Sequence, residues 1–154
     1  MAFKRALVLS LLALVATAGV VLATHEAVGL SSQLLARGTL DRSDRVEFLS
    51  ALAGQGRFAS NQVATVKASL APGGTTKWHG HLGPSIVVVT AGTLTVTHPM
   101  AGGCMSEPQS VGDAFFHTGK AHNFENKSAT VTAEFYVTYF VSAWPPNTDL
   151  ANPC

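Results

Sequence analysis

The chain has 154 residues, which is enough for one domain with a hydrophobic core and too few for two domains of ordinary size. Apolar residues make up 47% of the sequence and charged residues only 12%, a balance that excludes an intrinsically disordered chain. The formal charge is +1 and the basic residues beyond residue 23 are scattered singly, so the composition offers no surface for nucleic acid.

The first 23 residues have the three parts of a secretory signal peptide. Lys4 and Arg5 form a short positive region, residues 6–20 are almost wholly apolar, and Ala23 closes a stretch suited to signal peptidase. We expect cleavage after Ala23 and a bacterial protein that is secreted or periplasmic, without further membrane contact. The alternative is an uncleaved anchor, because residues 6–23 are just long enough to span a bilayer.

The segments that follow the leader peptide carry weaker signals. Residues 24–32 are small and polar and predict a loose leader, and residues 33–40 predict a first strand that ends near Gly38. Residues 46–53 fit a short helix or a strand equally well.

From Gln62 onward the sequence alternates and is rich in β-branched residues, which predicts strands. The predicted strands cover residues 63–70, 85–90, 93–98, 114–117 and 130–144. Pro72 and two glycines should end the first of them, and residues 99–108 should form a loop. In the last strand one face carries Val131, Ala133, Phe135, Val137, Tyr139 and Val141. Many short strands separated by Gly and Pro turns predict an all-β sandwich or barrel.

The chain has two cysteines, Cys104 and Cys154. In an oxidising compartment an even pair is most simply a disulfide, which would pin the C-terminus to the loop that holds Cys104. A free, reactive Cys104 is the alternative.

Two histidines, His79 and His81, lie one residue apart in the sequence. On a strand they point to the same face, because side chains alternate with period two. His122, from a distant strand, can complete a metal site with three nitrogen ligands.

This region resembles the first motif of the cupin family. Gly73, His79, His81 and Gly92 fall on the spacing of that motif, and Ser85 stands where the family usually carries a glutamate.

A later segment resembles the second cupin motif. Gly112, Gly119, His122 and Asn126 match it, with one residue fewer after the first glycine and with His117 in the position of a proline.

The resemblance implies a single-domain, double-sheet jelly-roll β-barrel preceded by the signal peptide (1–23). A leader with the first strand would occupy residues 24–45 and the barrel residues 46–154, with the motifs in 65–140. The sequence is also similar to small secreted actinobacterial cupins, which share a segment like Trp78–Pro84 and a C-terminal cysteine. Cupins often pair, so a homodimer is expected.

The resemblance also implies a metal on His79, His81 and His122. Imidazole nitrogen suits iron, zinc, copper or nickel better than magnesium or calcium. Because Ser85 cannot supply a carboxylate, the ion would keep its full positive charge and an open position. His117, Glu134 and Ser85 are candidates for additional members of the site.

Two functions fit this pattern. One is a small-molecule metalloenzyme of the oxygenase or isomerase type, with the substrate inside the barrel. The other is a non-catalytic module that binds a small ligand or a metal ion outside the cytoplasm. The missing glutamate favours this second function.

Overall fold

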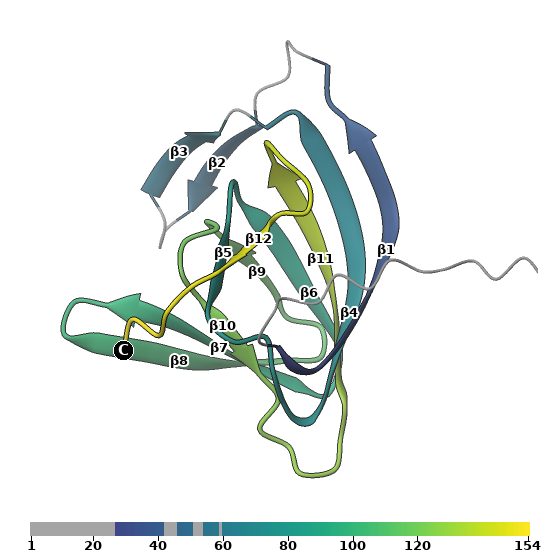
Figure 1. The fold of residues 1–154 in the computed structure, drawn as a ribbon, viewed down its shortest axis with the longest axis vertical. Helices are drawn as coiled ribbons and strands as arrows, with labels where there is room; N and C mark the ends of the chain where they lie inside the picture. The colour runs from purple at the N-terminus through teal and green to yellow at the C-terminus, as the bar shows by residue number, and fades with distance from the viewer. Residues whose placement is uncertain (1–26, 42–45, 51–53, 59) are drawn as a thin grey trace, which may run out of the picture.

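The computed structural model describes residues 27–41, 46–50, 54–58 and 60–154 (Figure 1). All elements in these ranges are β-strands, and each strand pair is antiparallel. The strands are β1 (Val28–Thr39), β2 (Val46–Ser50), β3 (Gly54–Phe58), β4 (Gln62–Thr75), β5 (His79–His81), β6 (Ser85–Ala91), β7 (Thr93–Met100), β8 (Gly103–Ser110), β9 (Ala114–His117), β10 (Asn123–Glu125), β11 (Ala133–Val141) and β12 (Asn147–Asp149). The predicted all-β fold is confirmed, and the predicted signal peptide lies outside the described residues.

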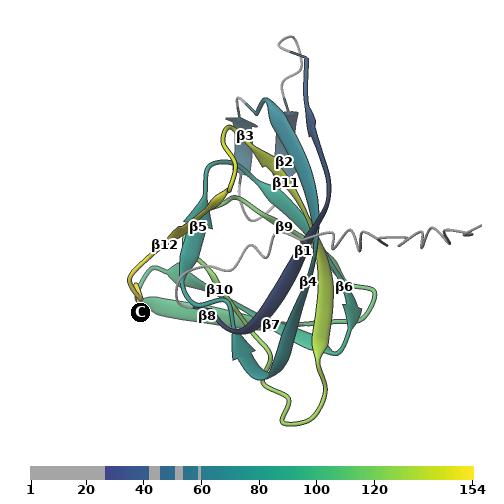
Figure 2. The ribbon, with the colours of Figure 1, turned by 45° about the vertical axis from the view of Figure 1, so that its right-hand side comes forward.

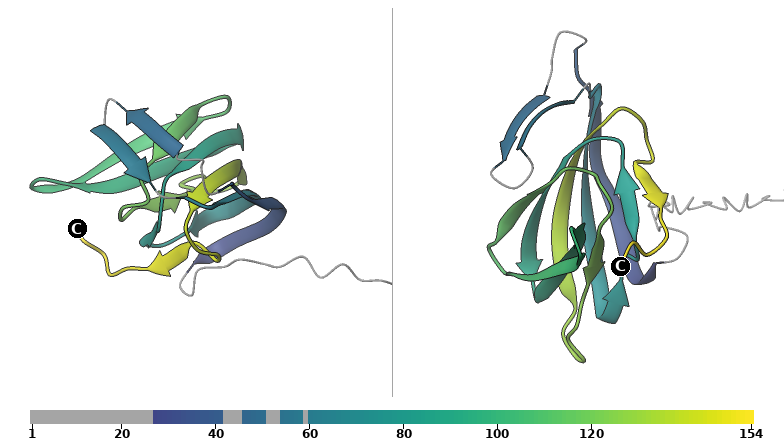
Figure 3. Two further views of the ribbon diagram at one scale, coloured as in Figure 1. Left: turned by 90° about the horizontal axis from the view of Figure 1, so that it is seen from above. Right: turned by 90° about the vertical axis from the view of Figure 1, so that its left-hand side faces the viewer.

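One large sheet makes up most of the molecule and curls into a nearly closed barrel (Figure 2). Its strand order is β8-β7-β10-β4-β11-β6-β9, and β1 pairs with β4 as well. β5 and β12 pair with each other on the side of the barrel that faces β4 and β11 (Figure 2). Figure 3 shows the C-terminal segment running alongside β5, and the β2–β3 hairpin at one end of the barrel.

The core lies between the two walls of the barrel and follows the alternation of the strands. Along β11 every second side chain is buried, from Ala133 to Val141, and β4 and β6 alternate in the same way. Burial of these apolar side chains is the main force that holds the barrel together. The side chains of this core are Val66, Ala68, Leu70, Val87, Val89, Leu94, Val96, Phe124, Ala133, Phe135, Val137, Tyr139 and Val141.

The N-terminal part of the described chain is more ordered than predicted. Residues 28–32 belong to β1 and are not a loose leader, because their backbone pairs with residues 68–75 of β4. The strand β4 likewise continues past Pro72 to Thr75, and Gly73 takes a φ of +72° there. The predicted boundary between units 24–45 and 46–154 stays a prediction.

Two further segments differ from the sequence-based expectation. The predicted loop 99–108 is wrong, because residues 103–110 form β8 and pair with β7 over its whole length. Backbone pairing outweighs the Gly and Pro content of this edge hairpin, whose side chains are largely exposed. Val131 lies before β11 and is exposed, so it does not share the buried face predicted for it.

The two cysteines form a disulfide between Cys104 of β8 and Cys154, with 5.9 Å between their Cα atoms. The predicted pairing is therefore confirmed, and the C-terminus is tied to the β7–β8 hairpin. In the part of the chain that the structure describes, no helix has the length and hydropathy needed to cross a bilayer.

Candidate metal centre

The first two histidines come from β5, a strand of three residues. His79 and His81 are both buried and flank Gly80, so they point to one face, as their spacing predicts. A Cβ at position 80 would lie 3.0 Å from the carbonyl oxygen of Gly119, so the opposite face of this strand has no room for a side chain.

The third and fourth histidines lie on either side of the turn between β9 and β10. His117 ends β9, and His122 precedes β10 and forms an isolated antiparallel bridge with His79. In this bridge the backbone N–H groups of His79 and His122 each donate to the other's carbonyl at 2.9 Å. The bridge thus joins two segments that are distant in the sequence.

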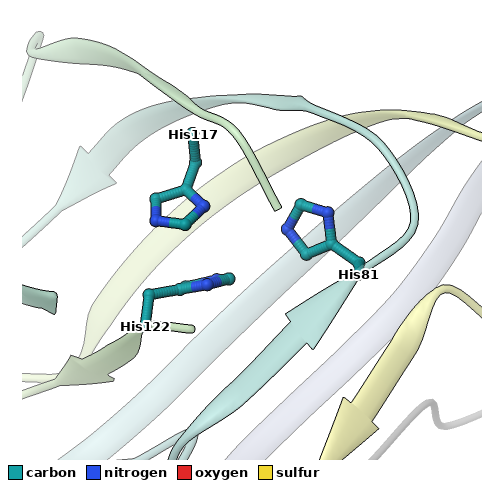
Figure 4. A group of neighbouring side chains, drawn as sticks. All are labelled: His81, His117 and His122. Atoms are coloured by element: carbon teal, nitrogen blue, oxygen red, sulfur yellow. The ribbon is translucent and has the colours of Figure 1, made fainter. Parts of the chain in front are cut away.

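His81, His117 and His122 converge inside the barrel (Figure 4). One nitrogen atom of each ring lies within 4.8 Å of one nitrogen of both others. The ring of His122 lies between those of His117 and His79, with centroid distances of 3.7 and 4.1 Å. His79 is therefore adjacent to this group, although it is not one of the three closest nitrogen donors.

The other candidate residues lie in different places. Ser85 is fully buried on β6, directly across from His117 of β9 and Tyr139 of β11, so it belongs to the same inner layer. Glu134 points outward from β11 and forms an ion pair of 3.0 Å with Lys67. The structure therefore brings Ser85 to the histidines and keeps Glu134 away from them.

Backbone carbonyl groups determine which ring nitrogen of three histidines carries the proton. The Nδ1 atoms of His79, His81 and His122 lie 3.0, 2.6 and 2.7 Å from the carbonyl oxygens of Lys77, Gly83 and Lys120. A carbonyl oxygen only accepts hydrogen bonds, so each Nδ1 carries the proton and the lone pair of Nε2 is available to a metal.

His117 has the opposite arrangement. Its Nδ1 accepts a hydrogen bond of 3.2 Å from the backbone N–H of Gly119. The neutral ring then carries its proton on Nε2. The proton of neutral His117 therefore lies on Nε2, whereas that of the other three histidines lies on Nδ1.

Burial keeps the histidines neutral. It lowers the pKa of His81 from 6.5 to about 4, although the Gly83 carbonyl opposes the shift. It lowers the pKa of His117 to about 3, with the neighbouring imidazoles as a second cause. The pKa values of His79 and His122 are also lowered, mainly by burial. At neutral pH the cluster therefore offers nitrogen lone pairs to an ion.

The wall around the cluster adds one polar group that sequence reasoning missed. The ring of Tyr139 stands perpendicular to that of His81, with 5.1 Å between the centroids. Burial raises the pKa of Tyr139 to about 12, so the phenol keeps its proton. Its position in the alternation of β11 predicted a core residue and gave no sign of the contact with His81.

These donors fit a divalent transition metal. Imidazoles prefer zinc, copper, iron or nickel, whereas magnesium and calcium prefer oxygen ligands. Among the described residues, the group of side chains that could hold a metal ion contains no carboxylate. An open hollow of about 380 Å³ reaches His81 from the surface and is also lined by Thr118 and Lys120.

Comparison with known protein-family models and with curated proteins gives no match. Solved structures do resemble the chain. An oxalate oxidase is 24% identical with a TM-score of 0.51, over 57% of this chain and 46% of that protein. The likeness thus spans less than half of the oxalate oxidase.

Two bacterial proteins show the same likeness. The polyketide cyclase RemF from Streptomyces resistomycificus is 19% identical with a TM-score of 0.54, over 82% of this chain and 75% of that one. A mutant of the Bacillus subtilis oxalate decarboxylase is 20% identical with a TM-score of 0.51, over 74% and 32%. All three have the cupin fold. Together with the nearly closed barrel, these likenesses show that the chain has the cupin fold that its two histidine motifs predict.

Proposed function

We propose that this protein is a metal-dependent enzyme of the cupin fold that acts on a small polar organic molecule outside the cytoplasm. The observation that carries the proposal is the convergence of His81, His117 and His122, with nitrogen atoms within 4.8 Å of one another in a buried, neutral cluster. Iron, zinc, copper or nickel would suit this donor set.

The position of the proton on each ring indicates how readily each histidine can donate a lone pair to a metal. Nε2 of His79, His81 and His122 is free of its proton, so these rings need no change of tautomer to bind a metal. His117 faces Ser85, the position where a glutamate is missing, and is proposed as the further nitrogen donor. Because its Nδ1 already accepts a bond from Gly119, His117 should contribute less to metal affinity than His81.

A bound ion would supply a Lewis acid, and without a carboxylate ligand it would keep its full double positive charge. The residues of the chain do the rest. Phe124, whose ring lies 5.0 Å from that of His122, helps to exclude water from the buried side of the site. Lys120 at the rim of the hollow favours an anionic molecule.

The location outside the cytoplasm rests on two features. The predicted signal peptide would direct the chain to secretion. The Cys104–Cys154 disulfide is compatible with an oxidising compartment, where such bonds persist.

One observation favours the alternative of a non-catalytic binding protein. The described cluster has no carboxylate, and Tyr139 keeps its proton far above neutral pH, so no evident general base stands beside the histidines. Turnover of a small organic molecule that is abolished in His81→Ala would decide for the enzyme.

The first test is elemental analysis of protein purified after secretion without an affinity tag. Wild type should carry about one equivalent of transition metal, His81→Ala should carry none, and His117→Ala should bind metal more weakly. His98→Ala, which removes a histidine outside the cluster, is the matched control and should keep the metal. Wild-type protein that takes up none of the four metals on reconstitution would refute the proposal.

A further inference from the structure

The C-terminal segment (residues 142–154) brings another side chain to the site. After β11 the chain crosses the barrel and forms β12, in which Asn147 lies directly opposite His81 of β5 (Figure 1). Side chains of directly paired residues point to the same face of a sheet. Asn147 therefore faces the side of β5 on which the histidine cluster lies.

One end of the Asn147 amide has a partner and the other has none. Its side chain hydrogen-bonds the phenol of Tyr139, the residue that packs on His81. Its Oδ1 is buried and accepts no hydrogen bond from any described residue. A buried acceptor without a donor is costly in a folded protein, so a ligand group that donates a hydrogen bond to this oxygen would be bound favourably.

The two side chains together present one donor and one acceptor. Because Oδ1 is free, it is the amide N–H that donates to the oxygen of Tyr139, and this leaves the phenolic O–H to donate elsewhere. The matching ligand carries a hydroxyl group next to an oxygen that accepts. The cation of Lys120 at the rim adds a preference for negative charge.

We propose that Asn147 and Tyr139 select small 2-hydroxy acids, whose hydroxyl group donates to Asn147 Oδ1 and whose carboxylate accepts from the Tyr139 O–H. This inference deepens the proposed function and shares its site, because it names the substrate class. Asn147 discriminates through the hydroxyl proton, and Tyr139 holds the carboxylate.

The test compares two probes by calorimetry: glycolate, the smallest 2-hydroxy acid, and methoxyacetate, in which a methyl group replaces the hydroxyl proton. Wild type should bind glycolate roughly tenfold more tightly than methoxyacetate, the loss expected for one buried hydrogen bond. Asn147→Leu should bind the two probes equally, and Tyr139→Phe should weaken both to a similar degree. Thr148→Ala, the exposed neighbour on β12, is the control and should behave as wild type.

Wild type that does not discriminate between the probes, or Asn147→Leu that still does, would overturn the inference. An unfolding curve of each variant excludes loss of the fold as the cause. Running the titrations with and without metal separates the two proposals. Discrimination by a protein that binds no metal would refute the metalloenzyme and keep the role of Asn147, whereas a metal-loaded protein without discrimination would do the reverse.

Discussion

At the scale of single residues, the candidate metal centre depends on backbone conformations next to the histidines. Lys77 has a φ of +58°, the one left-handed residue other than glycine among the described residues, and its carbonyl accepts the Nδ1–H of His79. This conformation costs an ordinary residue about 1–2 kcal/mol. This strained conformation thus occurs where the backbone orients the ring of His79.

A pair of substitutions at Lys77 tests this. Lys77→Gly should leave the free energy of unfolding and the metal affinity close to those of wild type, because glycine adopts this φ freely. Lys77→Val should be less stable than Lys77→Gly by about 2 kcal/mol, since a β-branched residue tolerates it worst. Urea unfolding and a metal-competition titration measure both effects. Equal stability of the two variants would show that the conformation does not matter.

The buried histidines also predict the pH dependence of the metal-free protein. The unfolded chain takes up a proton at His81 near pH 6.5, but the folded chain does so only near its lowered pKa of about 4. Between these values the unfolded state binds more protons, so stability falls as the pH falls. At about 1.4 kcal/mol for each pKa unit, His81 alone should cost about 3 kcal/mol across this window.

Urea unfolding of the metal-free protein at several pH values from 7.5 to 4.5 measures this change. His81→Gln should show a shallower decline than wild type. A free energy of unfolding that stays constant over the window would contradict the expected burial of neutral rings.

The sequence predicts these residues unequally. His79 and His81 follow from the period of a strand, and His122 from motif spacing. His117 enters the cluster because β9 pairs with β6, which sets it opposite Ser85, whereas the sequence left it one of three candidates. The contact of Asn147 with Tyr139 depends on how the chain folds back after β11. This path could not be predicted from any local sequence pattern.

At the scale of elements, the turn between β9 and β10 is the tightest part of the site. Gly119 has a φ of +86°, and a Cβ there would run into the backbone carbonyl oxygens of Gly83 and His81. Only glycine allows this turn to press against β5, and the contact sets the distance between His81 and His117.

Gly112 provides a matched control for Gly119. It has a similar φ of +91°, but a Cβ there would meet nothing within 4 Å. Gly112→Ala should therefore cost only the backbone strain, about 1–2 kcal/mol. Gly119→Ala should cost more and should also weaken metal binding, which thermal unfolding and elemental analysis will show. Similar losses in both variants would mean that close packing of the turn is unimportant.

Strong alternation made some elements predictable and its absence hid others. β4, β6, β7 and β11 were expected because they are rich in β-branched or aromatic residues, which alternate with polar or small ones in β4. β8 and β12 are rich in Gly, Pro and polar residues, and they are strands because neighbouring backbones pair with them. The strands that form the inner face of the barrel could therefore be predicted from the sequence better than the strands at its edges.

At the scale of the whole molecule, the disulfide between Cys104 and Cys154 links the end of the chain to the barrel. The disulfide spans 50 residues and ties the C-terminal segment to β8, while β12 of that segment pairs with β5 and its histidines. In the loop-entropy description, a loop of this length stabilises the fold by about 4 kcal/mol.

Replacement of both cysteines by serine should lower the free energy of unfolding by about this amount. It should also weaken metal binding, because β12 would then hold β5 by a few backbone hydrogen bonds only. The same result is expected when wild type is reduced. Unchanged metal affinity in the double variant would show that β5 keeps its place without the covalent tie.

The buried amide of Asn126 has a consequence for production of the protein. Its Nδ2 donates to the carbonyl oxygens of Leu70, Ala71 and Val131 at 2.9, 3.1 and 2.8 Å. Asn126-Lys127-Ser128 is also an acceptor sequence for N-linked glycans, which attach to this same nitrogen. A eukaryotic secretory host that adds a glycan before folding would replace one of the two hydrogens of this buried amide and force a sugar among the three carbonyl groups, so expression hosts without this pathway should yield the folded barrel.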